Sequence, residues 1–507
     1  MRNIGFGKSG FRWVLCAAGV AGVLGSVVAP VAKASEYLVN ASYAGPNGAA
    51  EGPYSGVYNT INAAFAAVGS GASVANPNYI YFAPGTYNVG TTSLSYSKSN
   101  VDLIGLSGNP NDVIITSTLD SAYNTGSGTI GTSGSATLQL KGNNVTAAYL
   151  TFANSTDTPY IVNDAHQAVS PTGSYATGQS QTTNDPAVAL LLQGDEQVFD
   201  DVNVLGYQDT LYTKGGRSYF VNSTISGDVD FIFANGTTVF NNSTINIDGD
   251  HSGGDIVAPS TDKRTSNGLV FLNSTITGNS VKGNAAIDPM NAANANGPAA
   301  NSMYLGRPWG WEQAGGDSSA VFINAKMANV IEPAGWLAWN SAETTSNANN
   351  NGNPAEDSRF AEYNSTDLLG NSINTSSRVS WSHQLTAAQA ADYTVDNIFS
   401  ESYPWYGDGY PSSDASNPGT GSANPSDPNY SWPAFWGDRN AQNAAADDNV
   451  LNNPSSYSDP SWTLGGNWDP TAQLDLIVVP EPATLALLGG FAVLPLMRRP
   501  RRRTLAA

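Results

Sequence analysis

Apolar and polar residues alternate along short stretches that recur between positions 198 and 327. Each stretch ends in an Asn or Asp with small polar neighbours, a pattern typical of a β-strand that runs into a turn. The near copies are Val-Phe-Asp-Asp-Val-Asn-Val at 198–204, Tyr-Phe-Val-Asn-Ser-Thr-Ile at 219–225, Val-Phe-Asn-Asn-Ser-Thr-Ile at 239–245, Val-Phe-Leu-Asn-Ser-Thr-Ile at 270–276 and Val-Phe-Ile-Asn-Ala-Lys-Met at 321–327.

The phenylalanines in second position of these stretches give the repeat length. They occupy positions 199, 220, 240, 271 and 322, so they are 21, 20, 31 and 51 residues apart. A coil of about 20 residues, with loops inserted into later coils, fits these intervals. The pattern predicts an all-β solenoid, a parallel β-helix whose interior is filled by ladders of Phe, Ile and Val. A large β-sandwich with coincidental turns is the alternative.

Other segments are expected to begin and close the solenoid. Residues 79–87 and 101–106 predict the first coils, residues 58–68 an amphipathic capping helix, and residues 384–395 a short closing helix. From position 401 the chain becomes rich in Pro, Gly and Ser, which predicts an extended linker through residue 478. We expect its tryptophans, at 405, 432, 436, 462 and 468, to pack on the solenoid, the alternative being that they stack on sugar.

Both ends of the chain carry the pattern of a targeting segment. Residues 1–34 combine early basic residues, an apolar run and an Ala-Lys-Ala site, which predicts a secretory signal peptide. Residues 479–507 combine Val-Pro-Glu-Pro, an apolar run and five arginines, and resemble the PEP-CTERM sorting signal of Gram-negative bacteria. A marginal membrane anchor is the alternative, because the apolar run is shorter than the roughly 20 residues of a membrane span.

Charge and cysteine content exclude several functions. Residues 35–480 hold 12 basic and 40 acidic groups, so their formal charge is 12 − 40 = −28, which disfavours nucleic acid as a partner. Cys16, the single cysteine, lies in the predicted signal peptide. The exported chain would therefore have no disulfide, no thiolate nucleophile and no cysteine ligand for zinc. It contains no Gly-x-Ser-x-Gly or His-Glu-x-x-His motif, and its three histidines are scattered at 166, 251 and 383.

Two aspartates in apolar surroundings are the strongest candidates for catalysis. Asp209 lies in Gly-Tyr-Gln-Asp-Thr-Leu-Tyr at 206–212, and Asp230 lies 21 residues later in Gly-Asp-Val-Asp-Phe-Ile-Phe at 227–233. In a coil of that length they would face each other across one strand spacing of about 4.8 Å. Repulsion would then raise one pKa and leave the other group ionised, which suits a proton donor and a nucleophile. Either aspartate alone is more readily explained as a turn cap.

Arg307, in Tyr-Leu-Gly-Arg-Pro-Trp at 304–309, can hold one of these carboxylates with two hydrogen bonds. These three blocks, in this order, resemble the signature blocks of pectin methylesterases, and the similarity extends over residues 37–400. The resemblance implies a right-handed parallel β-helix without metal or other cofactor. It also implies Asp230 as nucleophile, Asp209 as acid and base, Gln208 as oxyanion donor and Arg307 as partner of Asp230. By matching position, the sugar groove would be lined by Tyr212, Phe233 and Trp309.

This chain departs from the family pattern at a second oxyanion glutamine. The family has Gln-Ala-Val-Ala-Leu where this chain has Pro-Ala-Val-Ala-Leu at 186–190, and Pro186 offers no donor. Loss of one such donor can cost about 10²- to 10³-fold in rate. Gln167, next to His166, could replace it only if the polar stretch 171–185 folds back to the site. Ala234 and Asn88 are smaller departures, which affect the expected shape of the groove.

Together these observations predict an esterase domain at 35–400, between the signal peptide at 1–34 and the linker at 401–478, with the sorting tail at 479–507. The expected reaction is hydrolysis of galacturonate methyl esters in pectin or a related uronan, by a secreted or envelope-associated monomer. A weakened relative that binds acidic polysaccharide is the second hypothesis, and its basis is Pro186. A lyase or glycosidase on the same solenoid is the third.

Overall fold

The computed structural model describes residues 34–156, 161–162, 168–169, 186–248, 254–261, 267–278, 298–309, 318–339, 358–400, 468–474 and 477. Internal contacts divide the chain into two units, Met1–Lys33 and Ala34–Ala507, and every described residue belongs to the second. The predicted signal peptide and sorting tail, and the loop with His166 and Gln167, lie outside the described residues.

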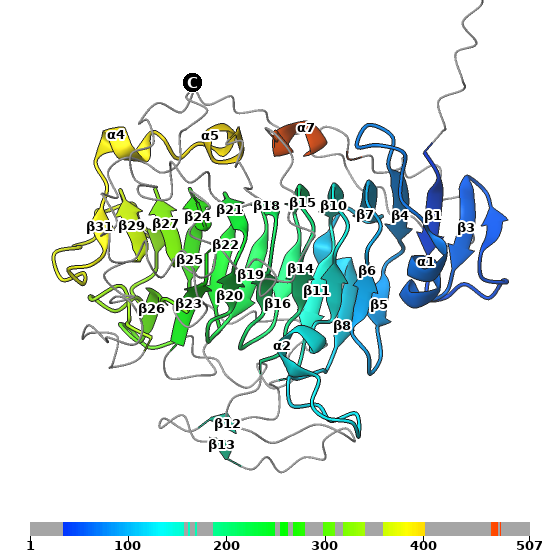
Figure 1. The fold of residues 1–507 in the computed structure, drawn as a ribbon, viewed down its shortest axis with the longest axis horizontal. Coiled ribbons are helices and arrows are strands. Elements are labelled where there is room, and N and C mark those ends of the chain that lie inside the picture. Colours follow the sequence, from blue (N-terminus) through cyan, green and yellow to red (C-terminus); the bar gives the residue numbers. More distant parts are fainter. Residues whose placement is uncertain are drawn as a thin grey trace, which may run out of the picture. The chain divides into compact units, whose positions relative to one another are not determined.

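Within the described residues, the strands form three long sheets and one short hairpin (Figure 1). The first sheet has the order β2 (Ala49–Glu51), β3 (Tyr54–Tyr58), β1 (Glu36–Val39), β4 (Asn78–Phe82), β7 (Val101–Gly105), β10 (Val145–Ala148), β15 (Gln197–Asp200), β18 (Arg217–Val221), β21 (Thr237–Asn241), β24 (Leu269–Leu272), β27 (Ser319–Ile323), β29 (Arg359–Tyr363) and β31 (His383–Gln384). The second has the order β30 (Thr366–Asp367), β28 (Lys326–Met327), β25 (Thr275–Thr277), β22 (Thr244–Ile247), β19 (Thr224–Gly227), β16 (Asn203–Leu205), β11 (Thr151–Asn154), β8 (Val113–Ser117) and β5 (Gly85–Asn88). The third has the order β26 (Met303–Gly306), β23 (Gly254–Pro259), β20 (Ile232–Ala234), β17 (Leu211–Thr213), β14 (Leu190–Leu192), β9 (Leu138–Leu140) and β6 (Leu94–Tyr96). The hairpin pairs β12 (Ile161–Val162) with β13 (Ala168–Val169).

The helices of the described residues are short. They are α1 (Ile61–Ala67), the 3-10 turn η1 (Pro110–Asp112), α2 (Gly131–Gly134), α4 (Ala387–Ala390), α5 (Val395–Ser400) and α7 (Pro470–Leu474). In the part of the chain that is described, none of them has the length and apolar character needed to cross a membrane.

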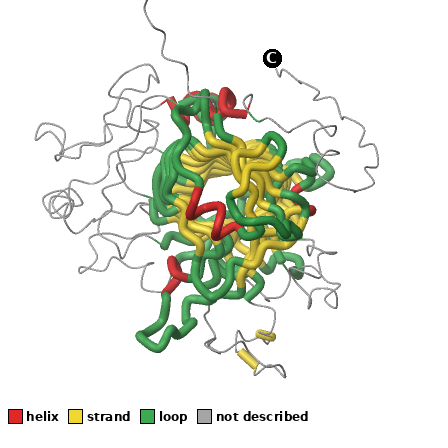
Figure 2. Tube along the Cα trace, turned by 90° about the vertical axis from the view of Figure 1, so that its right-hand side faces the viewer, coloured by secondary structure: helices red, strands yellow, loops and turns green. Residues whose placement is uncertain are grey.

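The three sheets make a right-handed parallel β-helix, as the sequence predicted. In the central coils each coil supplies one strand to each sheet and pairs in parallel with its neighbours, as β15 does with β10 and β18. The view along the coils shows the strands stacked behind one another around a common axis (Figure 2). Successive coils therefore place residues of equivalent sequence position side by side.

The predicted phenylalanine ladder forms the interior of the first sheet. Phe199, Phe220, Phe240, Phe271 and Phe322 are direct register partners on consecutive strands. Their rings stack with centroid distances of 4.4, 5.2, 4.7 and 4.4 Å, and all five side chains are fully buried. The inserted residues that lengthen two of the intervals leave this register unchanged, because they lie outside the strands.

Asparagine turns join the first sheet to the second. Asn222, Asn242, Asn273, Asn324 and Asn364 adopt φ values between 50° and 54°, a left-handed conformation that Asn tolerates better than most residues. Their side chains connect successive coils, as where Asn242 donates to Asn222 at 2.7 Å and Asn364 donates to Asn324 at 2.9 Å. These residues explain why each repeat changes direction at the same position.

The two ends of the solenoid agree only in part with the sequence prediction. At the N-terminal end, α1 forms inside the predicted range, with Thr60 as N-cap, and buries Ile61, Ala64 and Phe65. At the other end, residues 383–400 do not form one helix. They give β31, then α4 with a capping box at Thr386, then α5. Residues 383–384, at the start of the predicted helix, pair with β29 instead and extend the first sheet.

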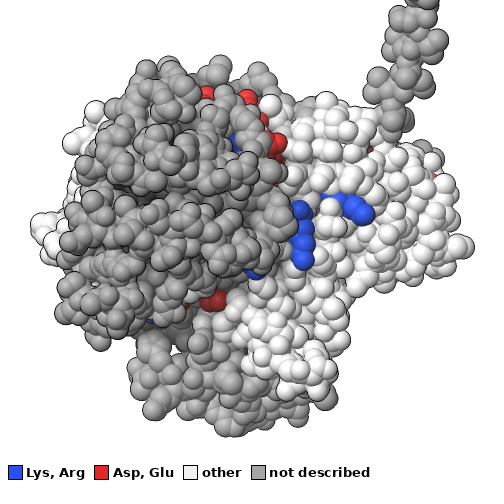
Figure 3. Space-filling model, in the orientation of Figure 1, with Lys and Arg blue, Asp and Glu red and all other residues white. Residues whose placement is uncertain are grey.

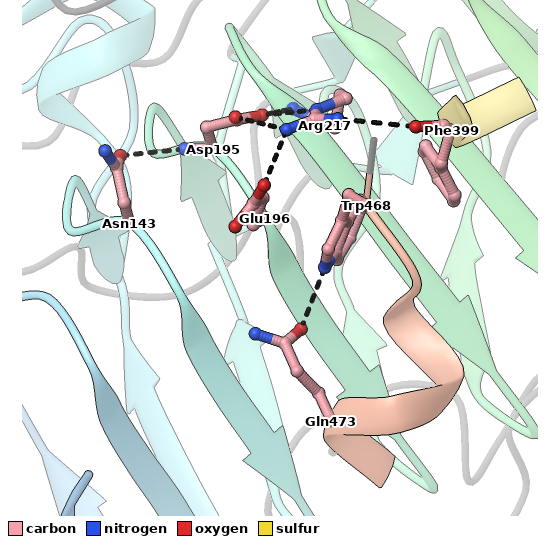
Figure 4. A network of polar contacts seen from close by, with 7 residues as sticks. All are labelled: Asn143, Asp195, Glu196, Arg217, Phe399, Trp468 and Gln473. Carbon is pink, nitrogen blue, oxygen red and sulfur yellow. Dashed lines mark hydrogen bonds and ion pairs between the residues drawn. The ribbon is translucent and has the colours of Figure 1, made fainter. Parts of the chain in front are cut away.

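The predicted linker contains a segment that docks on the outer face of the first sheet (Figure 4). Trp468 is 6% exposed, packs against Phe399 at 4.6 Å between ring centroids and lies 5.5 Å from the Arg217 guanidinium. Arg217 is fully buried and donates to the Asp195 carboxylate at 2.9 and 2.7 Å. Trp468 therefore packs on the solenoid as predicted, but residues 470–474 form the helix α7. The linker's other tryptophans lie outside the described residues.

Trp468→Ala is expected to release this docked segment, residues 468–474. Truncation of a buried Trp costs about 3 kcal/mol, which raises the open population about 100-fold. Limited proteolysis should therefore cut the segment much faster in the variant than in the wild type. Leu369→Ala, at a side chain that is 89% exposed, is the control and should leave the cleavage rate unchanged. Equal rates for Trp468→Ala and wild type would show that Trp468 does not hold the segment.

Charged side chains are sparse on the described surface. They make up 12% of the chain, and the face in Figure 3 is mostly white where it is described. Several charged side chains are instead buried, and one group of them, Asp230, Asp255 and the partly buried Arg307, lies at the third sheet and marks the candidate site.

Candidate active site

Asp209 and Asp230 lie in equivalent turns on adjacent coils. Each stands two residues before a strand of the third sheet, and those strands pair Leu211 with Ile232. Both aspartates have positive φ, 62° and 48°, and the Asp209 backbone N–H donates to the Val229 carbonyl at 3.1 Å. The repeat length seen in the sequence thus places the two carboxylates on neighbouring turns that face the same cavity.

Arg307 holds Asp230 with two hydrogen bonds. It directly follows β26, and its backbone N–H donates to the Val257 carbonyl at 3.0 Å. Its Nε donates to Asp230 Oδ1 at 2.9 Å, and its Nη2 donates to Asp230 Oδ2. The guanidinium also lies 4.2 Å from the ring centroid of Trp339, in a cation–π contact. This bidentate grip fixes the orientation of Asp230.

The electrostatic environment affects the pKa values of the two carboxyl groups differently. Asp209 is partly accessible at the cavity wall, yet burial raises its pKa well above the ordinary value, and the negative charge of Asp230 raises it further. Burial also raises the pKa of Asp230, but the hydrogen bonds and charge of Arg307 oppose that rise. Of these two aspartates, only Asp230 is hydrogen-bonded to Arg307. The arrangement therefore favours a protonated Asp209 beside an ionised Asp230.

The pair opens into a cavity of about 580 Å³. Its walls come from α2, from the turns that precede the third-sheet strands, and from the segments after β26. The lining residues are Ile130, Gly131, Thr132, Ser133, Pro186, Gln208, Asp209, Tyr212, Asp230, Phe233, Ala258, Arg307, Trp309 and Trp339. All seven residues that the sequence singled out for the site therefore reach one cavity.

Aromatic rings form one wall of the cavity. Tyr212 and Phe233 are register partners on β17 and β20 and stack at 4.0 Å between centroids. Trp309 meets both rings edge-on, at 6.3 and 5.7 Å. Such a wall gives a flat apolar surface suited to sugar rings. Trp339, which no motif indicated, completes it, because the turn after β28 returns the chain to this side.

Gln208, the predicted oxyanion donor, and Pro186 both line the cavity. The Gln208 carbonyl accepts from the Ala187 N–H at 3.2 Å, and the Pro186 carbonyl accepts from Ser121 at 2.8 Å. Pro186 therefore occupies the cavity wall without offering a hydrogen-bond donor. Thr132 and Ser133 of α2 line the cavity with it. Gln167, considered as a replacement donor, lies outside the described residues.

Asp255 is a third carboxylate that the sequence reasoning missed. It lies on β23, is 3% exposed, and its Oδ2 is 3.3 Å from Arg307 Nε. The pairing of Ile232 with Val257 shows that this coil is 25 residues long instead of 21. The 21-residue spacing that relates Asp209 to Asp230 therefore does not lead to Asp255 unless the insertion before β23 is known. No group of three or more His, Cys, Asp or Glu in the described ranges is arranged to hold a metal ion.

Comparisons with known proteins agree with this geometry. The pectinesterase family profile matches residues 175–402. Pectinesterase A of Dickeya dadantii (strain 3937) is 33% identical over 368 residues, which are 68% of this chain and 88% of that protein. Pectin methylesterase PemA from Erwinia chrysanthemi has a similar structure, with a TM-score of 0.52 and 29% identity over 73% of this chain and 97% of that one. A pectin methylesterase in complex with a hexasaccharide gives a TM-score of 0.52 and 28% identity at the same coverage. A chain with this cavity, and with this likeness over nearly the whole of its relatives, belongs to the pectinesterase family.

Proposed function

We propose that this enzyme, a carboxylic ester hydrolase, removes methyl groups from galacturonate methyl esters in pectin, giving pectate and methanol. The observation that carries the proposal is the pair Asp209 and Asp230, with Arg307 bound to Asp230, at the wall of one cavity. Membership of the pectinesterase family supports the reaction, and the hexasaccharide complex of a relative supports a polysaccharide substrate.

The first half of the reaction follows from the charge states. An ionised Asp230 oxygen attacks the ester carbonyl carbon and forms a C–O bond, which leaves a tetrahedral oxyanion. Gln208 stabilises this oxyanion from the cavity wall. When the intermediate collapses, the bond to the methoxy oxygen breaks and Asp209 gives that oxygen its proton, so methanol leaves. The sugar remains attached to Asp230 as an acyl-enzyme.

Water completes the cycle. Asp209, now ionised, takes a proton from a water molecule that attacks the acyl carbon, and the bond to Asp230 breaks. The products are a galacturonic acid group, which loses its proton to the solvent and becomes a carboxylate, an ionised Asp230 and a protonated Asp209. Arg307 keeps Asp230 ionised before the attack and holds its carboxyl group in position. Tyr212, Phe233 and Trp309 stack on the sugar and hold the ester above Asp230.

Methanol release from highly methylated pectin tests this function. We expect the purified protein to release methanol and to lower the methyl-ester content of pectin. It should form neither unsaturated products nor new reducing ends, because those would indicate a lyase or a glycosidase. Binding of pectin without methanol release would favour the second hypothesis, a weakened relative that binds acidic polysaccharide. Pro186 in the cavity wall is the observation that supports this second hypothesis.

The chain's organisation and location are part of the proposal. Residues 1–34 would direct export and be removed, residues 35–400 form the catalytic unit, and residues 401–478 extend from it. Residues 479–507 would be recognised by sorting machinery at the envelope of a Gram-negative bacterium, in the manner of a PEP-CTERM tail. We infer that the mature enzyme acts as a secreted or envelope-associated monomer on pectin or a related methyl-esterified uronan, without nucleic acid as a partner.

A further inference from the structure

Asp255 continues the line of the two candidate catalytic aspartates. The strands of three consecutive coils pair Leu211 with Ile232 and Ile232 with Val257. Two residues before these partners stand Asp209, Asp230 and Asp255, so the third sheet carries three aspartates in a row. Asp255 does not line the cavity, and it cannot reach a substrate there. Any effect that it has on catalysis must pass through its neighbours.

The neighbour that connects Asp255 to the reaction is Arg307. Arg307 Nε donates to Asp230 Oδ1 at 2.9 Å and lies 3.3 Å from Asp255 Oδ2, so this nitrogen is within ion-pair distance of both carboxyl groups. The second oxygen of Asp255, Oδ1, is buried and has no hydrogen-bond partner among the described residues. An ionised carboxylate in that position would be costly. The geometry therefore suits a neutral Asp255.

We propose that Asp255 is a positioning residue that competes with Asp230 for the Arg307 guanidinium, so that the charge of Asp255 decides how firmly Arg307 holds the nucleophile. The inference rests on the proposed function, because it assigns Asp230 the nucleophilic role. While Asp255 is neutral, Asp230 is the charged partner of Arg307, and the two hydrogen bonds between them are retained. When Asp255 ionises, the guanidinium is drawn toward it, and the bidentate grip on Asp230 weakens.

The direction of the pH dependence follows from the groups around Asp255. Burial raises the pKa of Asp255 to about 8, the charge of Asp230 adds to the rise, and Arg307 opposes it. Tyr304, its register partner on β26, has a raised pKa and stays neutral in this range. The other charged groups nearby are Asp209, Asp228 and Glu332, which act on Asp230, Arg307 or Tyr304. Arg307 therefore holds Asp230 most firmly well below pH 8, where Asp255 is neutral, and this hold weakens as the pH rises through the pKa of Asp255.

Trp339 emission tests this proposal without any need for catalysis. The Arg307 guanidinium lies over the Trp339 ring, so movement of Arg307 should change its fluorescence. The Trp339 signal is obtained as the difference between each protein and its Trp339→Phe version. We expect the wild-type signal to titrate with a midpoint near pH 8, and expect this titration to vanish in Asp255→Asn and in the second neutral variant, Asp255→Leu. Glu332→Gln is the matched control and should titrate like the wild type.

Persistence of the titration in either folded Asp255 variant would overturn the proposal, and so would a wild-type signal that does not titrate. The activity readout is the pH profile of kcat/KM for methanol release. We expect the ratio of activity at about pH 9 to that at about pH 7 to be about threefold or more larger in Asp255→Asn than in wild type. An unchanged ratio would likewise contradict the proposal. A wild-type protein that releases no methanol would refute the proposed function instead, while the fluorescence result would still decide whether Asp255 controls Arg307.

Discussion

Asp230→Asn is expected to lower kcat/KM for methanol release by a factor on the order of 10⁴ or more. An amide nitrogen and a neutral amide oxygen replace the charged oxygen that attacks the ester, so no acyl-enzyme forms. The fold should survive the change, because Asn adopts the same left-handed backbone elsewhere in this solenoid, with φ of 51° at Asn222 compared with 48° at Asp230. Affinity for pectin should remain, since the aromatic wall is untouched.

Asp201→Asn provides the matched control for this experiment. Asp201 is also an aspartate with positive φ, 56°, at a turn of the solenoid, but it is exposed and does not line the cavity. The same chemical change there should leave methanol release within about twofold of wild type. If Asp230→Asn retained more than about a tenth of wild-type activity while folded, Asp230 could not be the nucleophile.

Pro186→Gln is expected to raise kcat for methanol release, by about 10- to 100-fold, with a much smaller change in KM. The reason is that Pro186 lines the cavity beside Gln208 without supplying a donor, at the position where the family pattern carries a second oxyanion glutamine. A donor that meets the oxyanion contributes to the transition state more than to substrate binding. Steady-state kinetics on pectin of defined methylation would measure the effect.

One further variant, Pro186→Ala, defines what the Pro186→Gln result means. Pro186→Ala removes the ring without adding a side-chain donor, so it should show no comparable gain. A gain in both variants would assign the effect to the shape of the cavity. A loss or no change in Pro186→Gln alone would indicate that the oxyanion is already satisfied, for which Thr132 and Ser133 are the hydroxyl groups available on the cavity wall.

The pH dependence of the activity follows from the charge states of Asp209 and Asp230. Asp209 must be protonated when methanol leaves, and its pKa is raised well above the ordinary range by burial and by Asp230. Asp230 must be ionised at the same time, which Arg307 favours. Activity should therefore occupy a window in which the pair holds one proton. At alkaline pH, ionised Asp255 draws Arg307 away from Asp230. This lowers the upper pH limit of the activity.

Local repetition made most of the fold predictable. The stretches around Phe199, Phe220 and Phe240 repeat every 20 or 21 residues, and a parallel solenoid converts that spacing directly into contact between neighbouring strands. For the same reason Asp209 and Asp230 could be placed together from their spacing alone. The third member, Arg307, was expected as their partner from its chemistry and from the family resemblance, and the structure places it there.

The sequence by itself determined the solenoid, the register of its regular coils and the aspartate pair, because each depends on a short period that the chain repeats. Only the tertiary structure decided the placement of Asp255, of Trp339 and of Trp468. Asp255 lies beside Asp230 after a coil that is longer than the preceding one. Trp339 lies over Arg307 at the cavity, in a segment without a strand pattern. Trp468 contacts Arg217, which is 251 residues away in the sequence. Contacts of this kind are set by which loops are inserted and how they close, and no local pattern of apolar and polar residues encodes that.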